Sequence, residues 1–165
     1  MDLTVSLWRL VGDPEPASAQ VTAALEAGDP GLYPRAVAVA KTMGPVAAGC
    51  VPALRRFVDD RARLWLAVDA AIAMWRISGE PEPTVTALLE LSTTALKPRQ
   101  AIGEFHANLL SYAAKCFAEI GPAAEVAAPL LAAELARPRR RDIGAGNDIE
   151  LCHDCRSALD SIFEA

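Results

Sequence analysis

The most constraining feature of the sequence is an internal repeat. The segment 7–16, LWRLVGDPEP, returns as the segment 74–83, MWRISGEPEP. A second pair consists of MGPVAA at 43–48 and IGPAAE at 120–125. In each of the four segments an apolar residue lies one or two positions before a glycine, and a proline follows within two residues. Glycine commonly ends a helix and proline suits the first turn of a new one, so the repeat predicts a chain of short helices.

The spacing of the repeated glycines predicts how the helices are grouped. Gly12, Gly44, Gly79 and Gly121 lie 32, 35 and 42 residues apart, a period typical of one helix pair per repeat. Between the glycines, apolar residues recur at spacings of three and four, as in amphipathic helices. The pattern predicts helices at about 15–27, 32–43, 45–58, 63–78, 83–96, 99–120, 122–136 and 147–163.

The composition agrees with a packed helical protein. Apolar residues make up 52% of the 165 residues and charged residues 22%, which excludes a disordered chain. No run of about 18 consecutive apolar residues is present, and the first residues lack a signal-peptide pattern. We therefore expect a cytoplasmic protein without a membrane partner, whose four cysteines are reduced thiols. The net charge of −5 disfavours nucleic-acid binding.

Three stretches of the sequence resemble HEAT repeats. The segments 44–54 (GPVAAGCVPAL) and 121–131 (GPAAEVAAPLL) are similar to the first helix of that family, including its internal proline. The alanine-rich segment 68–77 (VDAAIAMWRI) is similar to its second helix.

The resemblance implies an all-α, right-handed α-α superhelix of about seven to eight helices. It would form a single domain over 1–165, with a partial repeat at 1–12 and repeats at about 13–44, 45–79, 80–121 and 122–165. The partial first repeat suggests that the chain begins inside a longer array. A more polar last helix, with His153, Arg156 and Asp160, is what a terminal capping repeat needs.

The resemblance also implies that the second helix of each pair lines a concave surface that binds partners. On this basis we expect a scaffold or adaptor that contacts a protein or peptide, and the opposing interpretation is a merely solvated surface. Ile72 is expected there as an exposed aliphatic residue. The candidate partner-binding residues are Arg35, Trp65, Asp69, Ile72, Tyr112, Lys115, Asp154 and Ser157.

Basic residues gather in the turns between first and second helices, and we call this set the basic rim. Its members are Arg61, Arg63, Lys97, Arg99, Arg137, Arg139, Arg140 and Arg141. Turns of one kind lie on one edge of such an array, so the rim could contact nucleic acid, as in HEAT-like DNA glycosylases. Solvated loops are the simpler interpretation of the same residues.

Few residues in the sequence suggest metal binding or catalysis. Cys152 and Cys155 are a weak metal-site candidate, because zinc needs two more ligands that the spacing does not supply. Buried packing of Cys155 is the favoured interpretation. His106 and His153 lack the His-Glu pairs of HEAT-repeat hydroxylases. We therefore expect no catalytic residue and no cofactor, with a relative of HEAT-like lyases as a further alternative.

Overall fold

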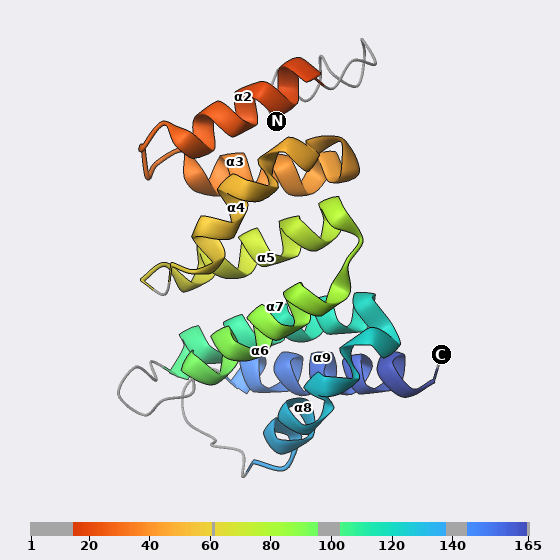
Figure 1. Ribbon diagram of the computed structural model, residues 1–165. Helices are drawn as coiled ribbons and strands as arrows, with labels where there is room; N and C mark the ends of the chain where they lie inside the picture. The colour runs from red at the N-terminus through yellow and green to blue at the C-terminus, as the bar shows by residue number, and fades with distance from the viewer. Residues whose placement is uncertain (1–14, 61, 96–102, 138–144, 165) are drawn as a thin grey trace. The chain divides into compact units, whose positions relative to one another are not determined.

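The computed structural model describes residues 15–60, 62–95, 103–137 and 145–164, with side chains for 15–60, 62–93, 108–137 and 148–164. Within these ranges every regular element is a helix, so the all-α prediction is confirmed. The chain forms two compact units, residues 1–80 and 81–165. The boundary between them, at 80/81, lies one residue after the expected repeat boundary at 79/80. Each unit is described below by itself (Figure 1).

Unit 1 contains helices close to the predicted positions. They are α2 (Glu15–Glu26), α3 (Tyr33–Met43), the 3-10 helix η1 (Gly44–Cys50) with its continuation α4 (Val51–Val58), and α5 (Leu64–Ser78). The expected single helix at 45–58 therefore consists of a 3-10 segment followed by an α-helix. Pro52, in the first turn of α4, falls where its missing N–H removes no helical hydrogen bond.

Unit 2 repeats this plan. Its elements are α6 (Pro81–Ala95), α7 (Gly103–Ile120), the 3-10 helix η2 (Gly121–Ala127) with its continuation α8 (Ala128–Leu135), and α9 (Ala145–Phe163). η2 and α8 match η1 and α4 in type and length. The expected partial repeat at 1–12, including Gly12, lies outside the described residues.

The glycine turns have the same geometry in both units. Gly44 and Gly121 adopt φ angles of +60° and +69°, which residues with a side chain rarely adopt. A Cβ atom on Gly44 would lie 3.5 Å from the carbonyl oxygen of Arg76, and one on Gly121 would lie 3.6 Å from that of Ser161. Arg76 and Ser161 occupy equivalent positions in the last turns of α5 and α9. Each turn therefore packs against the end of the next second helix.

The same turns bear on membrane insertion. By length and composition alone, Tyr33–Val58 and Asn108–Leu135 could cross a membrane. Each stretch contains a positive-φ glycine, Gly44 in the first and Gly121 in the second. Each is thus two helices joined by a turn and not one continuous spanning helix.

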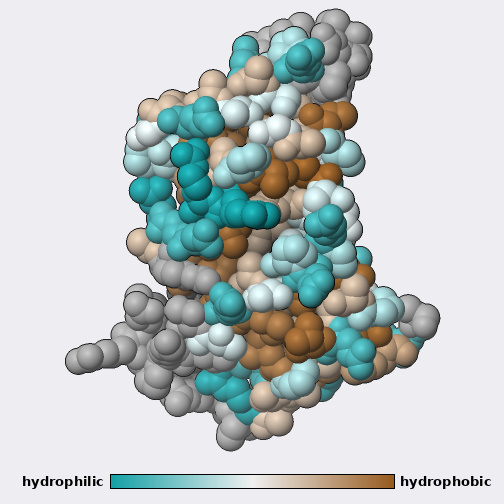
Figure 2. Space-filling view, viewed as in Figure 1, coloured by the Kyte–Doolittle hydropathy of each residue, from teal (hydrophilic) through white to brown (hydrophobic). Residues whose placement is uncertain are grey.

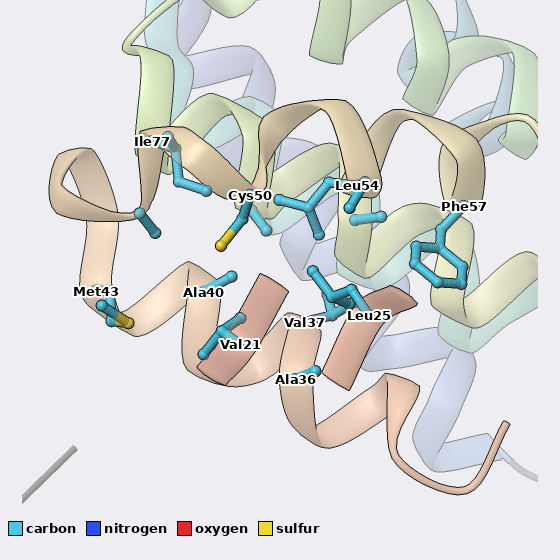
Figure 3. Packing of buried hydrophobic residues seen from close by; sticks show 14 of the residues in the cluster. Val21, Leu25, Ala36, Val37, Ala40, Met43, Cys50, Leu54, Phe57 and Ile77 are labelled. Carbon is cyan, nitrogen blue, oxygen red and sulfur yellow. The ribbon is translucent and has the colours of Figure 1, made fainter. Parts of the chain in front are cut away.

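The core of unit 1 is formed where α2 and α3 meet η1, α4 and α5 (Figure 3). Small residues of α3 and α5 let the helices approach closely, and larger side chains from α2 and α4 fill the remaining space. The fully buried members include Val37, Ala40, Cys50, Leu54 and Ala70. On α3, Ala36 and Ala40 are buried whereas Ala38 and Thr42 are exposed, so this helix has one face in the core and one toward solvent.

In unit 2, α7 packs against α6 and α9, and α9 also contacts η2 and α8. Leu110, Ala113 and Phe117 of α7 are fully buried, as are Cys155 and Ala158 of α9. Cys155 stands where the repeat places Ala70 and Ala113, so a small side chain is required at this position in both units.

Candidate partner-binding surface

The second helices expose a narrow stripe of residues at one repeated register. On α7 the stripe comprises Asn108, Tyr112, Lys115 and Glu119, of which Tyr112 is half-buried and the others are exposed. The spacing of four, three and four places these residues on one side of the helix. The rest of the described helix is largely buried, so the stripe is the part of α7 that a partner could reach.

The stripe on α5 has the same register. Trp65, Asp69, Ile72 and Arg76 stand where α7 has Asn108, Tyr112, Lys115 and Glu119. Trp65 is 38% exposed, and Arg76 is exposed. The prediction of an exposed Ile72 is wrong, because Ile72 is only 5% exposed. An aliphatic side chain gains free energy by burial, so this position belongs to the interior of the protein.

Arg35, on α3, is exposed as expected. It borders a groove of about 260 Å³ between α2 and α3, whose other lining residues are mainly apolar. The apolar lining includes Val21, Ala24 and Val39, and Leu32 contributes a partly exposed side chain. Arg35 therefore combines a cation with an adjacent apolar surface.

An ion pair joins α3 to the stripe of α5 in unit 1. Lys41 Nζ donates a hydrogen bond to Asp69 Oδ1 over 3.0 Å, and both side chains are about one-third exposed. The candidate residue Asp69 is thus already paired within the unit. A partner would meet a locally neutral Lys41–Asp69 pair and not an isolated carboxylate.

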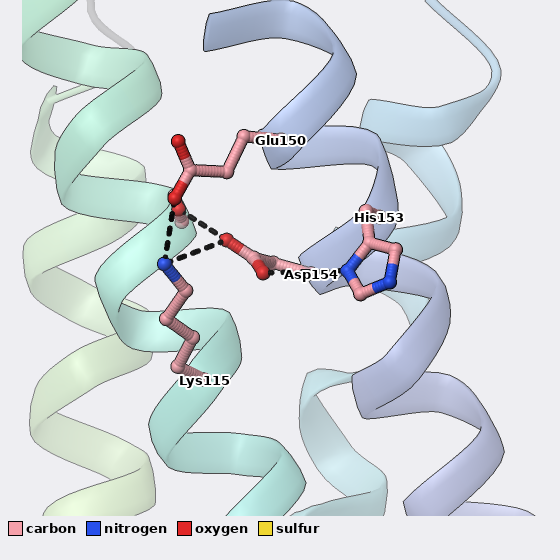
Figure 4. A network of polar contacts seen from close by, with 5 residues as sticks. Lys115, Glu150, His153 and Asp154 are labelled. Atoms are coloured by element: carbon pink, nitrogen blue, oxygen red, sulfur yellow. Dashed lines mark hydrogen bonds and ion pairs between the residues drawn. The ribbon is translucent and has the colours of Figure 1, made fainter.

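Unit 2 has a larger network between α7 and α9 (Figure 4). Lys115 Nζ lies 2.8 Å from Glu150 Oε1 and 3.4 Å from Asp154 Oδ2. The hydrogen bond that Lys115 donates to Glu150 raises the pKa of Lys115, with a further contribution from Asp154, while partial burial acts in the opposite direction. The lysine is consequently held as a cation between two carboxylates.

Asp154 does not face solvent, and its predicted place on an exposed charged ridge is wrong. Its side chain is only 8% exposed, and it accepts a hydrogen bond from the hydroxyl of Ser111. His153 Nδ1 lies 3.7 Å from its other carboxylate oxygen. A carboxylate buried this far needs such partners, because desolvation of an unpaired charge is unfavourable. Asp154 therefore fastens α9 to α7, whereas Ser157 is exposed as expected.

Lys41, Ser111 and Glu150 complete these networks but were not among the predicted residues. Glu150 occupies the repeat position of Trp65 and Asn108. Extending the repeat alignment by one helical turn would have identified it. Ser111 gave no such signal, because a serine at a buried helix position is recognised only when its partner on the next helix is known.

Two aromatic rings and one arginine pack together in unit 1. The rings of Tyr33 and Phe57 are 4.7 Å apart, and the guanidinium carbon of Arg63 lies 5.5 Å from the centre of the Tyr33 ring. Figure 2 shows hydrophilic residues at the edge of unit 1 where the α2–α3 and α4–α5 turns lie. The Tyr33 and Phe57 rings are tilted against each other by 56°, and the guanidinium of Arg63 lies over one of them.

The two described members of the basic rim are ion-paired. Arg63 lies 3.7 Å from Asp60, and Arg137 lies 2.8 Å from Glu134. The remaining members are outside the described residues: Arg61, Lys97, Arg99, Arg139, Arg140 and Arg141. Pairing lowers the number of counterions that contact with a phosphate backbone could release.

The surroundings of Cys155 favour a packing role over metal binding. Cys155 is fully buried, and burial raises the pKa of its thiol to about 12. Metal binding requires the thiolate, which this environment disfavours. Within the described residues no group of three or more potential ligands is present. His106 lies on α7 with its side chain outside the description, and His153 is highly exposed.

Comparison of the chain with protein-family models, with curated proteins and with solved structures gives no match.

Proposed function

We propose that the chain is a HEAT-like α-solenoid module that binds a protein or peptide partner through the exposed stripes of its second helices, and that it does not catalyse a reaction. The observation that carries the proposal is the common register of these stripes. Trp65, Asp69 and Arg76 on α5 correspond one by one to Asn108, Tyr112 and Glu119 on α7. Repeated helices that reserve the same positions for solvent provide an extended surface for contacts.

The repeated turns support the solenoid part of the proposal. Gly44 and Gly121 both have a positive φ. A Cβ atom on either would meet a carbonyl oxygen at the equivalent position of the next second helix. The 3-10 start of the following helix also recurs, as η1 and η2. A solenoid is built from such identical steps, and a concave surface would follow from a small rotation at each step.

The side chains on the stripes suit a protein surface. Trp65, Tyr112 and Arg35 are of the types that most often dominate the free energy of protein association. Lys115 and Ser157 add polar groups at the same register. Asp154 acts from below the surface, by holding α9 against α7. The cytoplasm is the proposed location of such a module.

Photo-crosslinking in cells tests the proposal directly. Benzoylphenylalanine in place of Tyr112 or Trp65 should yield one discrete adduct of higher mass, which mass spectrometry would identify. The matched control is the same amino acid in place of Thr86, which is exposed on the first helix α6. Equal adducts at positions 86 and 112, or none at 65 and 112, would contradict the proposal.

A binding measurement with the identified partner then separates contact from folding. Tyr112→Ala should weaken binding of the purified partner by at least about tenfold if Tyr112 is a central contact. Thr86→Ala should leave the Kd unchanged. Far-UV circular dichroism of both variants verifies that the helices are retained.

A further inference from the structure

The outer face of α9 is exposed where the equivalent face of α7 is buried. His153 and Arg156 stand at the repeat positions of Ser111 and Ala114, which α9 covers in unit 2. In this fold, therefore, this face of a second helix is the one on which another helix packs. On α9 it forms a shallow groove of about 540 Å³ lined by His153, Arg156, Ser157, Asp160, Ser161 and Glu164.

Charge is ordered along this face of α9. The basic residues His153 and Arg156 come first along it, and the acidic residues Asp160 and Glu164 follow toward its C-terminal end. Within the described residues, neither Arg156 nor Asp160 forms an ion pair. The face therefore changes sign within about one helical turn, between Arg156 and Asp160.

Large apolar side chains lie at both ends of the same helix. Ile149 is 67% exposed near its start, and Phe163 is 63% exposed at its end. Exposed aromatic and aliphatic residues beside ordered charges are common where proteins associate.

We propose that this outer face of α9 binds a second copy of the same chain, with the two α9 helices antiparallel about a twofold axis near Ala158. This face borders the partner-binding register proposed above, since Ser157 belongs to both, but the inference does not rest on that function. With this axis, Arg156 of each copy lies opposite Asp160 of the other, and His153 lies close to Glu164 of the other. A twofold contact requires a surface that complements itself, and opposite charges on either side of the axis satisfy this requirement.

A parallel arrangement does not fit the same face. In-register parallel helices would place Arg156 beside Arg156 and Asp160 beside Asp160, and like charges at such a contact oppose association. The order of charge therefore favours an antiparallel arrangement of two α9 helices.

The dimer should be weak and sensitive to salt. One helix face from each copy makes a small contact, below the size of a permanent homodimer. The ion pairs are exposed, so each contributes little and is screened as the ionic strength rises. Sedimentation velocity of residues 1–165 at about 200 μM and low salt should show a reversible dimer that dissociates in about 1 M NaCl.

Charge exchange tests the geometry of the contact. Arg156→Glu and Asp160→Arg should each give a monomer, because each creates like charges across the axis. A mixture of the two variants should form a heterodimer, and the double variant Arg156→Glu/Asp160→Arg should recover the homodimer. Glu82→Arg, a charge reversal at an exposed position on α6, is the matched control and should remain a dimer.

The outcomes separate the possible occupants of the face. A monomeric wild-type chain under these conditions would overturn the proposal. Dimers that persist in both single variants would place the contact elsewhere. Failure of the mixed variants to associate would exclude the antiparallel arrangement, provided that circular dichroism shows both to be folded.

Discussion

Asp154 Oδ2 lies 3.4 Å from Nζ of Lys115, and this contact joins a nearly buried carboxylate on α9 to a half-exposed ammonium on α7. Asp69, at the equivalent position on α5, makes a similar contact with Lys41 but is about one-third exposed. The two aspartates thus make a similar contact with a lysine at two depths, and the buried one also accepts the Ser111 hydrogen bond.

Asp154→Ala should lower the free energy of unfolding of unit 2 by about 1–3 kcal/mol, because it leaves the Ser111 hydroxyl without its partner. Asp69→Ala should cost at most about 1 kcal/mol, as expected for an exposed ion pair. Urea unfolding followed by circular dichroism measures both. All three tryptophans lie within residues 1–80, so tryptophan fluorescence reports unit 1 separately. Equal losses for the two variants would show that burial of Asp154 has no effect.

Gly44→Ala should destabilise unit 1 by about 1–3 kcal/mol, because a side chain is strained at its φ of +60°. Gly49→Ala is the control. Gly49 lies in η1 without a positive φ, and its added Cβ would make only an ordinary contact, 3.8 Å from Ser18 Oγ. That change should be neutral or stabilise by up to about 1 kcal/mol. Tryptophan fluorescence in urea distinguishes the two variants.

Cys155 should react with a thiol reagent at pH 8 only when the protein unfolds, whereas the partly buried Cys152 should react in the folded state. The folded pKa of Cys155, about 12, exceeds the ordinary value of 9.0. The contribution of this group to stability is therefore fully present below pH 9 and is lost as the pH rises toward 12. Cys155→Ala should remove that part of the pH dependence. Rapid labelling of native Cys155 at pH 8, followed by peptide mapping, would contradict the burial.

The basic rim should not retain nucleic acid. We expect no mobility shift of a short DNA or RNA duplex at about 50 μM protein and low salt, since non-specific binders act in this concentration range. A shift that Arg63→Glu or Arg137→Glu removes would instead support the nucleic-acid alternative. A mobility shift that neither variant removes would indicate that the arginines at 139–141 bind the nucleic acid.

The helices could be predicted from the sequence because their limits are set locally. Gly79 followed by Pro81, and Gly121 followed by Pro122, mark ends and starts that need no knowledge of the tertiary structure. The stripe register was predictable for the same reason, since helical spacing alone puts Trp65, Asp69 and Tyr112 on corresponding faces.

Burial at single positions could not be predicted in the same way. Ile72 and Asp154 share the register of exposed residues, yet both are buried. Their burial depends on what approaches the helix from outside, as Ser111 and Lys115 do for Asp154. The 3-10 starts at Gly44 and Gly121 were also missed, because apolar periodicity does not distinguish a 3-10 turn from an α-helical one.

The junction at Glu80 and Pro81 has a practical consequence. α5 ends at Ser78 and α6 begins at Pro81, so a break in the chain between Glu80 and Pro81 interrupts no helix. Proline has no amide hydrogen to donate, and the new N-terminus would remove no hydrogen bond from the start of α6. The two halves of the chain are thus natural candidates for separate expression, isotope labelling of one half at a time, and religation.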